Sequence, residues 1–300
     1  SSGRGPIDVM LDEGVRFRHT YVVGQTGTGK STLLLNMISD DIERGRGVAV
    51  IDPHGPLIDR VIEHIPRDRI SDVVLLDLAD TESPVGFNVL RLSETDVVRY
   101  RFARDLVIDD LLVYLHRTYD PQMMGPIFET QFRAMLALLL GHEPPEPPYV
   151  PSLHVLPLLY SNRDLRNRLI ERGRGVDPVT EMIIEEALKV RGENALDNMA
   201  PYVTNKFSRF IADRALRNVT CQQSTLDFDR IIGHRQILLV HLARGRIGDH
   251  AAGLIASQLV SRLRLAVMKR AINEGHPPFY LYADEFQLVA DARFVEMLAE

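Results

Sequence analysis

Twelve residues near the amino terminus combine glycine, lysine and hydroxyl side chains at the spacing of a phosphate-binding loop. The segment 21–32 contains Gly-x-x-x-x-Gly-Lys-Ser between a short apolar run and an apolar helical run. Glycine lets the backbone turn its N–H groups inward, and the helix that follows adds the positive end of its dipole. The residues that we expect to bind nucleotide phosphates are Gly24, Thr26, Gly27, Thr28, Gly29, Lys30, Ser31 and Thr32.

Two side chains of this loop have the chemistry to act on the phosphates directly. The ammonium group of Lys30 can reach the β- and γ-phosphates, where charge builds up during phosphoryl transfer. The hydroxyl group of Ser31 is a suitable ligand for Mg²⁺. The pattern therefore predicts that Lys30 is both a binding and a catalytic residue, and that Ser31 is a metal ligand.

A second acidic motif lies near the other end of the chain. The apolar run 279–283 is followed by Asp284 and Glu285, which is the pattern of a Walker B strand. Asp284 would hold Mg²⁺ through a water molecule, and Glu285 would orient or deprotonate the attacking water. Because a carboxylate directly follows the metal-binding Asp, we expect hydrolysis rather than slow, switch-type GTP turnover.

Short apolar strands that alternate with helices are expected to position both motifs. Strands are predicted over 21–23, 47–52, 72–77, 235–242 and 279–285, and helices over 31–44, 56–64 and 249–273. The run 47–52 is apolar throughout its first five residues, which indicates a strand buried on both faces, and 72–77 is of the same kind. Strand–helix–strand repetition predicts an α/β fold with a parallel sheet.

The region from about 90 to 215 has the apolar periodicity of helices and almost no strand signal. Because it separates the two motifs, we expect it to be an all-α lobe inserted into the nucleotide-binding core. The predicted organisation is a first part of the core over 1–90, the helical insertion over 91–215 and a second part of the core over 216–300. A proline-rich stretch at 143–151 is expected to be a surface connector.

Composition limits the environment and the partners. The single cysteine, Cys221, excludes an internal disulfide and a multi-cysteine metal site, and it fits a reducing cytoplasm. Because uninterrupted apolar runs stay well short of about 18 residues, we expect no membrane span in this chain. The net charge of −6 argues against a protein that coats DNA nonspecifically, but not against a ring that contacts DNA through a few loops.

Four segments together resemble the HerA/FtsK superfamily of P-loop ATPases, especially the branch with type IV secretion coupling proteins (TraG/TraD-like) and HerA-type translocases. The inserted helical region is similar to that family only in type. The segments are the strand and glycine loop in 19–32, Asp-Pro-His-Gly in 51–58, the strand and basic turn in 239–248, and Asp-Glu-Phe-Gln in 280–287.

The resemblance implies a RecA-like core, ATP and Mg²⁺ as cofactors, a homo-hexameric ring and ATP-driven movement of DNA through its bore. It places the protein in the cytoplasm, or at a membrane if a span precedes this segment. In such rings a neighbouring subunit supplies an arginine to the γ-phosphate. Arg244 and Arg246 are candidates for that role, and a solvated basic turn is the alternative. The family carries a polar sensor on a strand after Walker B, and none is found before Glu300. We therefore expect either that the chain is truncated there or that the sensor comes from elsewhere.

Other residues leave two interpretations open. Asp52 and His54 would either contact the water shell of Mg²⁺ or belong to a plain turn that Gly55 permits. Five arginines in 163–174 would either bind phosphates or form a solvated helix face, because Asp164 and Glu171 lie among them.

Two other functions compete with DNA translocation. One is a nucleotide-gated docking or coupling protein, which recruits protein or nucleoprotein substrates to a secretion channel through its helical lobe. The other is the ATPase partner of a nuclease in DNA end processing or anti-phage defence. Stimulation of hydrolysis by DNA, and the identity of a co-purifying protein, separate these functions from the first.

Overall fold

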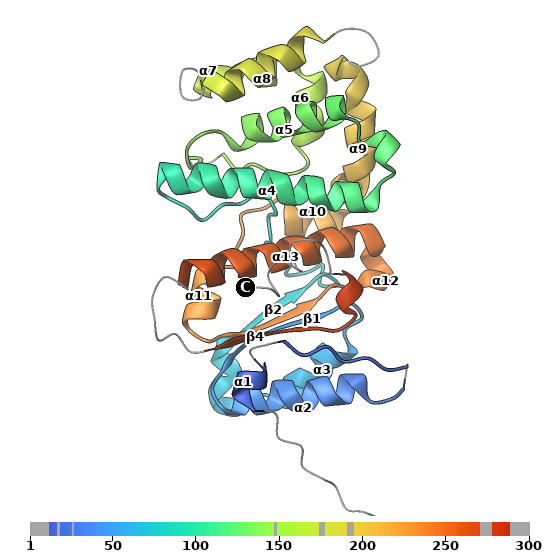
Figure 1. The fold of residues 1–300 in the computed structure, drawn as a ribbon, viewed down its shortest axis with the longest axis vertical. Helices are drawn as coiled ribbons and strands as arrows, with labels where there is room; N and C mark the ends of the chain where they lie inside the picture. Colours follow the sequence, from blue (N-terminus) through green and yellow to red (C-terminus); the bar gives the residue numbers. More distant parts are fainter. Residues whose placement is uncertain are drawn as a thin grey trace, which may run out of the picture.

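A four-stranded parallel sheet lies in the lower half of the protein as drawn in Figure 1, between two layers of helices. A computed structural model describes residues 12–16, 19–25, 27–146, 149–173, 178–190, 195–270 and 278–288. Across the sheet the strands are β2 (Val73–Asp77), β3 (Ile237–His241), β1 (Gly47–Asp52) and β4 (Phe279–Ala283). With helices on both of its faces, the sheet confirms the predicted α/β fold with a RecA-like core.

Strand β1 is the inner strand that pairs with both β3 and β4. All six of its residues are buried, as its apolar sequence predicts. The prediction that β2 is a strand of the same kind is wrong, because β2 lies at an edge of the sheet. Leu75 in β2 is 39% exposed, since an edge strand has a partner on one side only.

Alternate residues of the strands build separate cores on the two faces of the sheet. Helices α2 (Lys30–Glu43) and α3 (Pro56–Glu63) cover one face, where they pack against Val48 and Val50 of β1. Helices α11 (Phe228–Gly233) and α13 (Asp249–Arg270) cover the other face, toward which Ala49 and Ile51 point. This two-residue alternation is what a strand buried between two layers of helices requires.

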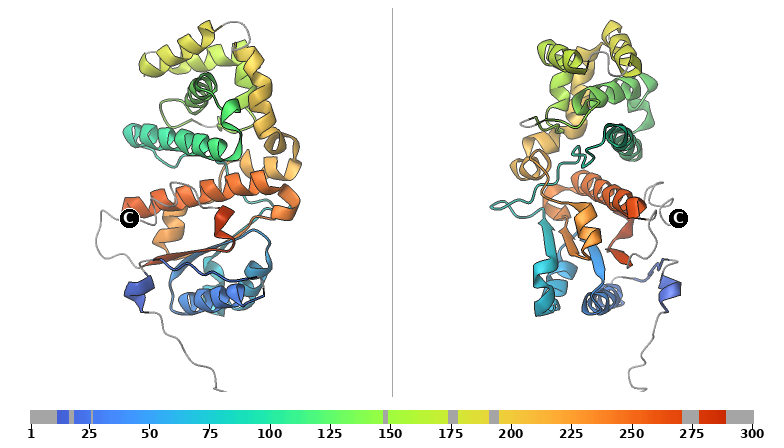
Figure 2. Two further views of the ribbon diagram at one scale, coloured as in Figure 1. Left: turned by 45° about the vertical axis from the view of Figure 1, so that its right-hand side comes forward. Right: turned by 90° about the vertical axis from the view of Figure 1, so that its left-hand side faces the viewer.

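Beyond α13 the described elements form a stack of helices (Figures 1 and 2). The buried side chains of this stack and those of the α13 face of the sheet belong to one continuous hydrophobic cluster. The helices are α4 (Val97–Thr118), α5 (Pro126–Leu140), α6 (Leu156–Ser161), α7 (Arg163–Gly173), α8 (Pro178–Lys189), α9 (Leu196–Ala212) and α10 (Arg214–Thr220). The helical lobe, as we call α4–α10, is therefore packed directly onto the sheet domain.

One of the described helices, α13, is long and apolar enough by composition to cross a membrane. The relevant window, Asp249–Lys269, is 67% buried inside the fold. Its apolar residues instead pack against the sheet on one side and the helical lobe on the other. These contacts account for its hydrophobicity as the central helix of a folded chain.

The strand predicted over 21–23 is wrong. Residues 19–25 lie outside the sheet, and Tyr21 and Val23 are 72% and 77% exposed. An extended segment joins a sheet only by pairing its N–H and C=O groups with a neighbour, and β4 pairs only with β1. The expected helix after Asp291 and the last turn of the one expected over 249–273 lie outside the described residues.

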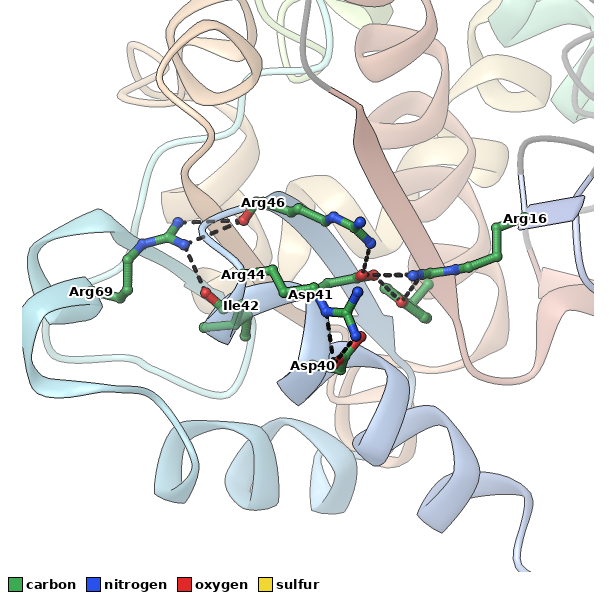
Figure 3. A network of polar contacts seen from close by, with 8 residues as sticks. Arg16, Asp40, Asp41, Ile42, Arg44, Arg46 and Arg69 are labelled. Carbon is green, nitrogen blue, oxygen red and sulfur yellow. Dashed lines mark hydrogen bonds and ion pairs between the residues drawn. The ribbon is translucent and has the colours of Figure 1, made fainter. Parts of the chain in front are cut away.

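A buried carboxylate ties the amino-terminal segment to the sheet (Figure 3). Arg16, in the short helix α1 (Glu13–Arg16), donates two hydrogen bonds of 2.7 and 2.6 Å to Asp41 of α2. Arg46 donates a third at 2.9 Å, and the Tyr282 hydroxyl of β4 donates a fourth. The guanidinium of Arg16 also lies 4.2 Å from the ring centre of Tyr280. Asp41 therefore joins α1, α2 and β4.

Burial raises the pKa of Asp41, but hydrogen bonds from Arg16, Tyr282 and Arg46 outweigh it, so that its pKa is lowered. We expect Asp41→Asn to reduce the free energy of unfolding by about 3 kcal/mol at pH 7. Since the folded-state pKa is lowered, this contribution is present above pH of about 4 and is lost as the pH falls through the folded-state pKa. Urea unfolding between pH 2 and pH 7 measures both effects.

The neighbouring Asp40 provides the matched control. Asp40 pairs with Arg44 at 2.9 Å, but the two side chains are 47% and 54% exposed. Because exposed pairs contribute little, Asp40→Asn should change the free energy of unfolding by less than about 0.5 kcal/mol. Equal losses in the two variants would show that the buried network does not anchor the sheet.

Candidate nucleotide-binding site

Charged side chains collect where the four parallel strands end. Asp52 is the last residue of β1, Asp77 of β2 and His241 of β3, while Asp284 and Glu285 directly follow β4. The sheet register places His241 beside both Asp52 and Asp77. The amide of Asp284 donates a 3.0 Å hydrogen bond to the carbonyl of Ile51, which continues the pairing of β4 with β1.

The glycine loop lies on this same side of the sheet, which the carboxyl ends of the strands form and which we call the carboxyl edge. Helix α2 has 14 residues and β1 has six, and only Arg44, Gly45 and Arg46 connect them. Both elements are about 20 Å long at their usual rise per residue, so a tight connection returns the chain alongside the helix. The start of α2, at Lys30, is therefore level with the end of β1 and with Asp284.

The loop has the backbone conformation that its glycines allow. Gly27 and Gly29 have φ angles of +81° and +94°, in the left-handed region that favours glycine. The Lys30 ammonium donates hydrogen bonds of 2.6 Å to the Gly24 carbonyl and 2.8 Å to the Gln25 carbonyl. Lys30 thus lies across the loop with which it is predicted to act.

Of the remaining predicted loop residues, three lie within the described part of the chain and one lies outside it. Ser31 and Thr32 belong to the first turn of α2, and the hydroxyl of Thr28 donates a 2.7 Å hydrogen bond to the Gln25 carbonyl. Thr26 lies outside the described residues.

The groups at this edge fit a magnesium nucleotide. An ammonium, a hydroxyl and the start of a 14-residue helix suit phosphate oxygens, and a carboxylate oxygen suits Mg²⁺. In the part of the chain that the structure describes, no cluster of three or more His, Cys, Asp or Glu side chains could hold a metal by itself. Ser31 and Asp284 would therefore hold Mg²⁺ together with phosphate oxygens.

The structure brings some of the predicted residues into contact and leaves others apart. Burial raises the pKa of Asp284, and the charge of Asp52 raises it further. Among the described residues, Lys30 and Ser31 make no hydrogen bond or ion pair with Asp284 or Glu285. The glycine-loop segment meets the segment after β4 through Tyr21 and Phe286, whose ring centres are 5.1 Å apart.

The Asp-Pro-His-Gly segment is a turn that caps a helix, which supports one of its two predicted interpretations. Asp52 is 1% exposed and accepts hydrogen bonds of 2.8 Å from the amides of His54 and Leu57. Gly55 has a φ of +100°, and a Cβ atom there would lie 2.8 Å from Nε2 of His241. Asp52 therefore uses its carboxylate to shape the start of α3, whereas His54 extends toward the site.

Glu285 is in contact with residues that the sequence did not connect to it. Nη1 of Arg244 lies 2.9 Å from Oε2 of Glu285, and Nε of Arg244 lies 2.7 Å from Asp249. His54 lies 3.5 Å from the other carboxylate oxygen of Glu285. The loop expected at 243–248 contains a single helical turn, α12 (Arg244–Ile247), whose start points Arg244 at Glu285.

Both candidates for an arginine supplied to a neighbouring subunit are bonded within their own chain. Arg244 is paired with Glu285 and Asp249, and Arg246 donates a hydrogen bond to the carbonyl of Ala79. Strand order explains why sequence reasoning missed the Arg244 contact. Arg244 follows β3 and Glu285 follows β4. The two residues meet because β3 and β4 lie on either side of the single strand β1.

The arginines in 163–174 have mixed roles. Arg166 is buried, and its guanidinium donates hydrogen bonds of 2.7 and 2.8 Å to the carbonyls of Leu159 and Tyr160. This arginine therefore terminates α6 rather than facing a ligand. Arg163, Arg168 and Arg172 are exposed, and Arg174 lies outside the described residues.

Comparison with known families gives a match over the first third of the chain. Residues 3–109 match the family described as the central domain of helicase HerA. The matched region contains the glycine loop, α2, β1, the Asp52 turn and β2. No curated protein matches the chain.

The hydrogen bonds of Asp52 lead to a stability prediction. We expect Asp52→Ala to lower the free energy of unfolding by about 2 kcal/mol, because it removes the cap of α3 and leaves buried amides without an acceptor. The loss should be the same in Mg²⁺ and in chelator, since Asp52 already uses both oxygens within the fold. Asp59→Ala, on the exposed side of α3, is the control and should change stability by less than about 0.5 kcal/mol.

Chemical denaturation of the three proteins in both buffers makes the measurement. A loss that appears only in Mg²⁺ would assign Asp52 to the metal instead of the turn.

Proposed function

Because the chain belongs to the HerA/FtsK superfamily of P-loop ATPases through residues 3–109, we propose that it hydrolyses ATP to move DNA through a ring of six identical subunits. The observation that supports this most directly is the shared position of the two motifs. The glycine loop at Lys30 and the acidic pair Asp284–Glu285 lie at the carboxyl edge of one parallel sheet. In open α/β sheets this edge is where ligands bind.

Each residue of the proposed site has a distinct task. Lys30 and the loop amides bind the β- and γ-phosphates, while Ser31 and Asp284 hold Mg²⁺, which offsets the charge on those phosphates when bound. Partial burial raises the pKa of Asp284, so a cation beside this carboxylate relieves an unfavourable environment. Glu285 takes the proton from the attacking water.

The packing of the helical lobe supports a motor rather than an isolated ATPase domain. The lobe and one face of the sheet share a continuous hydrophobic cluster through α13 and α4. Because well-packed interiors deform little, a shift at the site is passed to the lobe as a movement of whole helices. The net charge of −6 argues against a protein that coats DNA nonspecifically, and it is compatible with DNA contact through a small number of loops in the ring.

Two substitutions should separate nucleotide binding from hydrolysis. Lys30→Ala should weaken ATP binding roughly 30-fold, because it removes hydrogen bonds from a charged donor to the phosphates. Glu285→Gln should bind ATP as wild type does but lower kcat at least about 100-fold. Fluorescent-nucleotide titration and steady-state phosphate release measure these effects, with Lys189→Ala on the surface of α8 as the control. Equal affinity for ATP in wild type and Lys30→Ala would refute the assignment.

DNA dependence tests the motor itself. In the assembled oligomer we expect duplex or single-stranded DNA to raise the ATPase rate, since a translocase couples turnover to its track. The rate is measured with each DNA and without it, with Glu285→Gln as the blank. An active oligomer that neither DNA stimulates would instead favour the docking function, and a co-purifying nuclease would favour DNA end processing or defence.

A further inference from the structure

Neighbouring side chains approach both oxygens of the carboxylate proposed to activate water. Oε2 of Glu285 accepts hydrogen bonds from Arg244 at 2.9 Å and from Gln287 at 3.2 Å. Oε1 lies 3.5 Å from Nε2 of His54. These three groups come from α12, from the segment after β4 and from the Asp52 turn, so they surround the carboxylate from different sides.

A carboxylate in this arrangement is a poor general base. To take a proton from water it needs a free oxygen lone pair near the water. Arginine carries a permanent charge and holds carboxylates with directional hydrogen bonds, so it competes with the water for that oxygen. Opening of the Arg244–Glu285 pair should therefore free Oε2 and make the carboxylate a better base.

The backbone on both sides of the pair has an unusual conformation. Glu285 has a φ of +54°, and Ala243, directly before Arg244, has a φ of +48°. Residues other than glycine adopt this region only when other contacts compensate. The side chains of Arg244 and Glu285 are also 28% and 35% exposed, so water can replace their contact.

The segment that carries Arg244 is bound on its other side by the helical lobe. Arg209 of α9 donates a 2.9 Å hydrogen bond to the carbonyl of Arg246, and its guanidinium occupies the space beside Gly248, where a Cβ atom would lie 2.9 Å away. From the end of α4, the hydroxyl of Tyr114 donates a 2.5 Å hydrogen bond to the carbonyl of His250. Residues 244–250 thus contact the site at one end and the lobe along their length.

We propose that Arg244 is a positioning residue that holds Glu285 away from water, and that the helical lobe controls this hold through residues 244–250. A displacement of α9 moves the turn through Arg209 and withdraws Arg244 from the carboxylate. This inference rests on the proposed role of Glu285 in ATP hydrolysis. It assigns Arg244 a task within its own chain instead of in a neighbouring subunit.

The test compares ATPase kinetics of the full chain without DNA. Arg244→Ala should raise kcat about two- to fivefold, the factor expected for loss of one partly exposed ion pair, and leave KM for ATP unchanged. Arg244→Lys should stay closer to wild type, because it keeps the charge. Arg209→Ala should raise kcat in the same direction, and combining it with Arg244→Ala should add nothing. Arg168→Ala, an exposed arginine elsewhere in the lobe, is the control.

The opposite results are equally specific. A fall in kcat for Arg244→Ala, with the melting temperature and ATP affinity of wild type, would show that Arg244 assists the reaction instead of holding Glu285. If the wild type binds ATP without turnover and Arg244→Ala is inactive as well, the proposed hold on Glu285 is also overturned. An unchanged kcat in Arg209→Ala would show that the helical lobe does not control the contact between Arg244 and Glu285. Failure of the proposed function gives another pattern: wild type and Lys30→Ala then bind ATP equally.

Discussion

The position of β1 between β3 and β4 is the constraint on which the site depends. The turn after β1 must be tight enough to lie beneath the ends of both neighbouring strands. Asp52 tightens it by accepting hydrogen bonds from two backbone amides. Gly55 then passes against His241 with no room for a side chain. The same turn accepts a 2.9 Å hydrogen bond from the amide of Arg244 to the carbonyl of Pro53. Through this one turn, the ends of three strands have fixed relative positions.

Much of this architecture follows from the sequence, because burial and capping are local signals. The apolar run of β1 predicts a strand buried on both faces, and Asp96 precedes the periodic run of α4, where its side chain accepts the Arg99 amide at 3.0 Å. The glycine loop is recognisable because Gly27 and Gly29 need positive φ angles. The apolar residues 21–23, in contrast, have the composition of a strand but no strand partner, and composition does not reveal a partner.

The contacts of the candidate site were less predictable because they depend on strand order. Arg244 and Glu285 are 41 positions apart, and Asp77 meets His241 at 2.8 Å across an even longer separation. Each motif indicates its own chemistry, but sequence spacing does not reveal that the basic turn after β3 faces the acidic pair after β4. Arg244, a candidate for an arginine supplied to a neighbouring subunit, forms ion pairs with Glu285 and Asp249 of its own chain in this structure.

The carboxylates at the amino and carboxyl ends of the strands differ in how deeply they are buried. Asp41, at the amino edge, is fully buried and bonded to two arginines and a tyrosine, and removing such a partner costs about 3 kcal/mol. The Arg244–Glu285 pair at the carboxyl edge is partly exposed, so its contribution is about 0.2–1 kcal/mol. The left-handed backbone of Glu285 costs about 1 kcal/mol, which is close to that gain. A small load from the helical lobe should therefore open the Arg244–Glu285 pair more readily than it opens the buried Asp41 network.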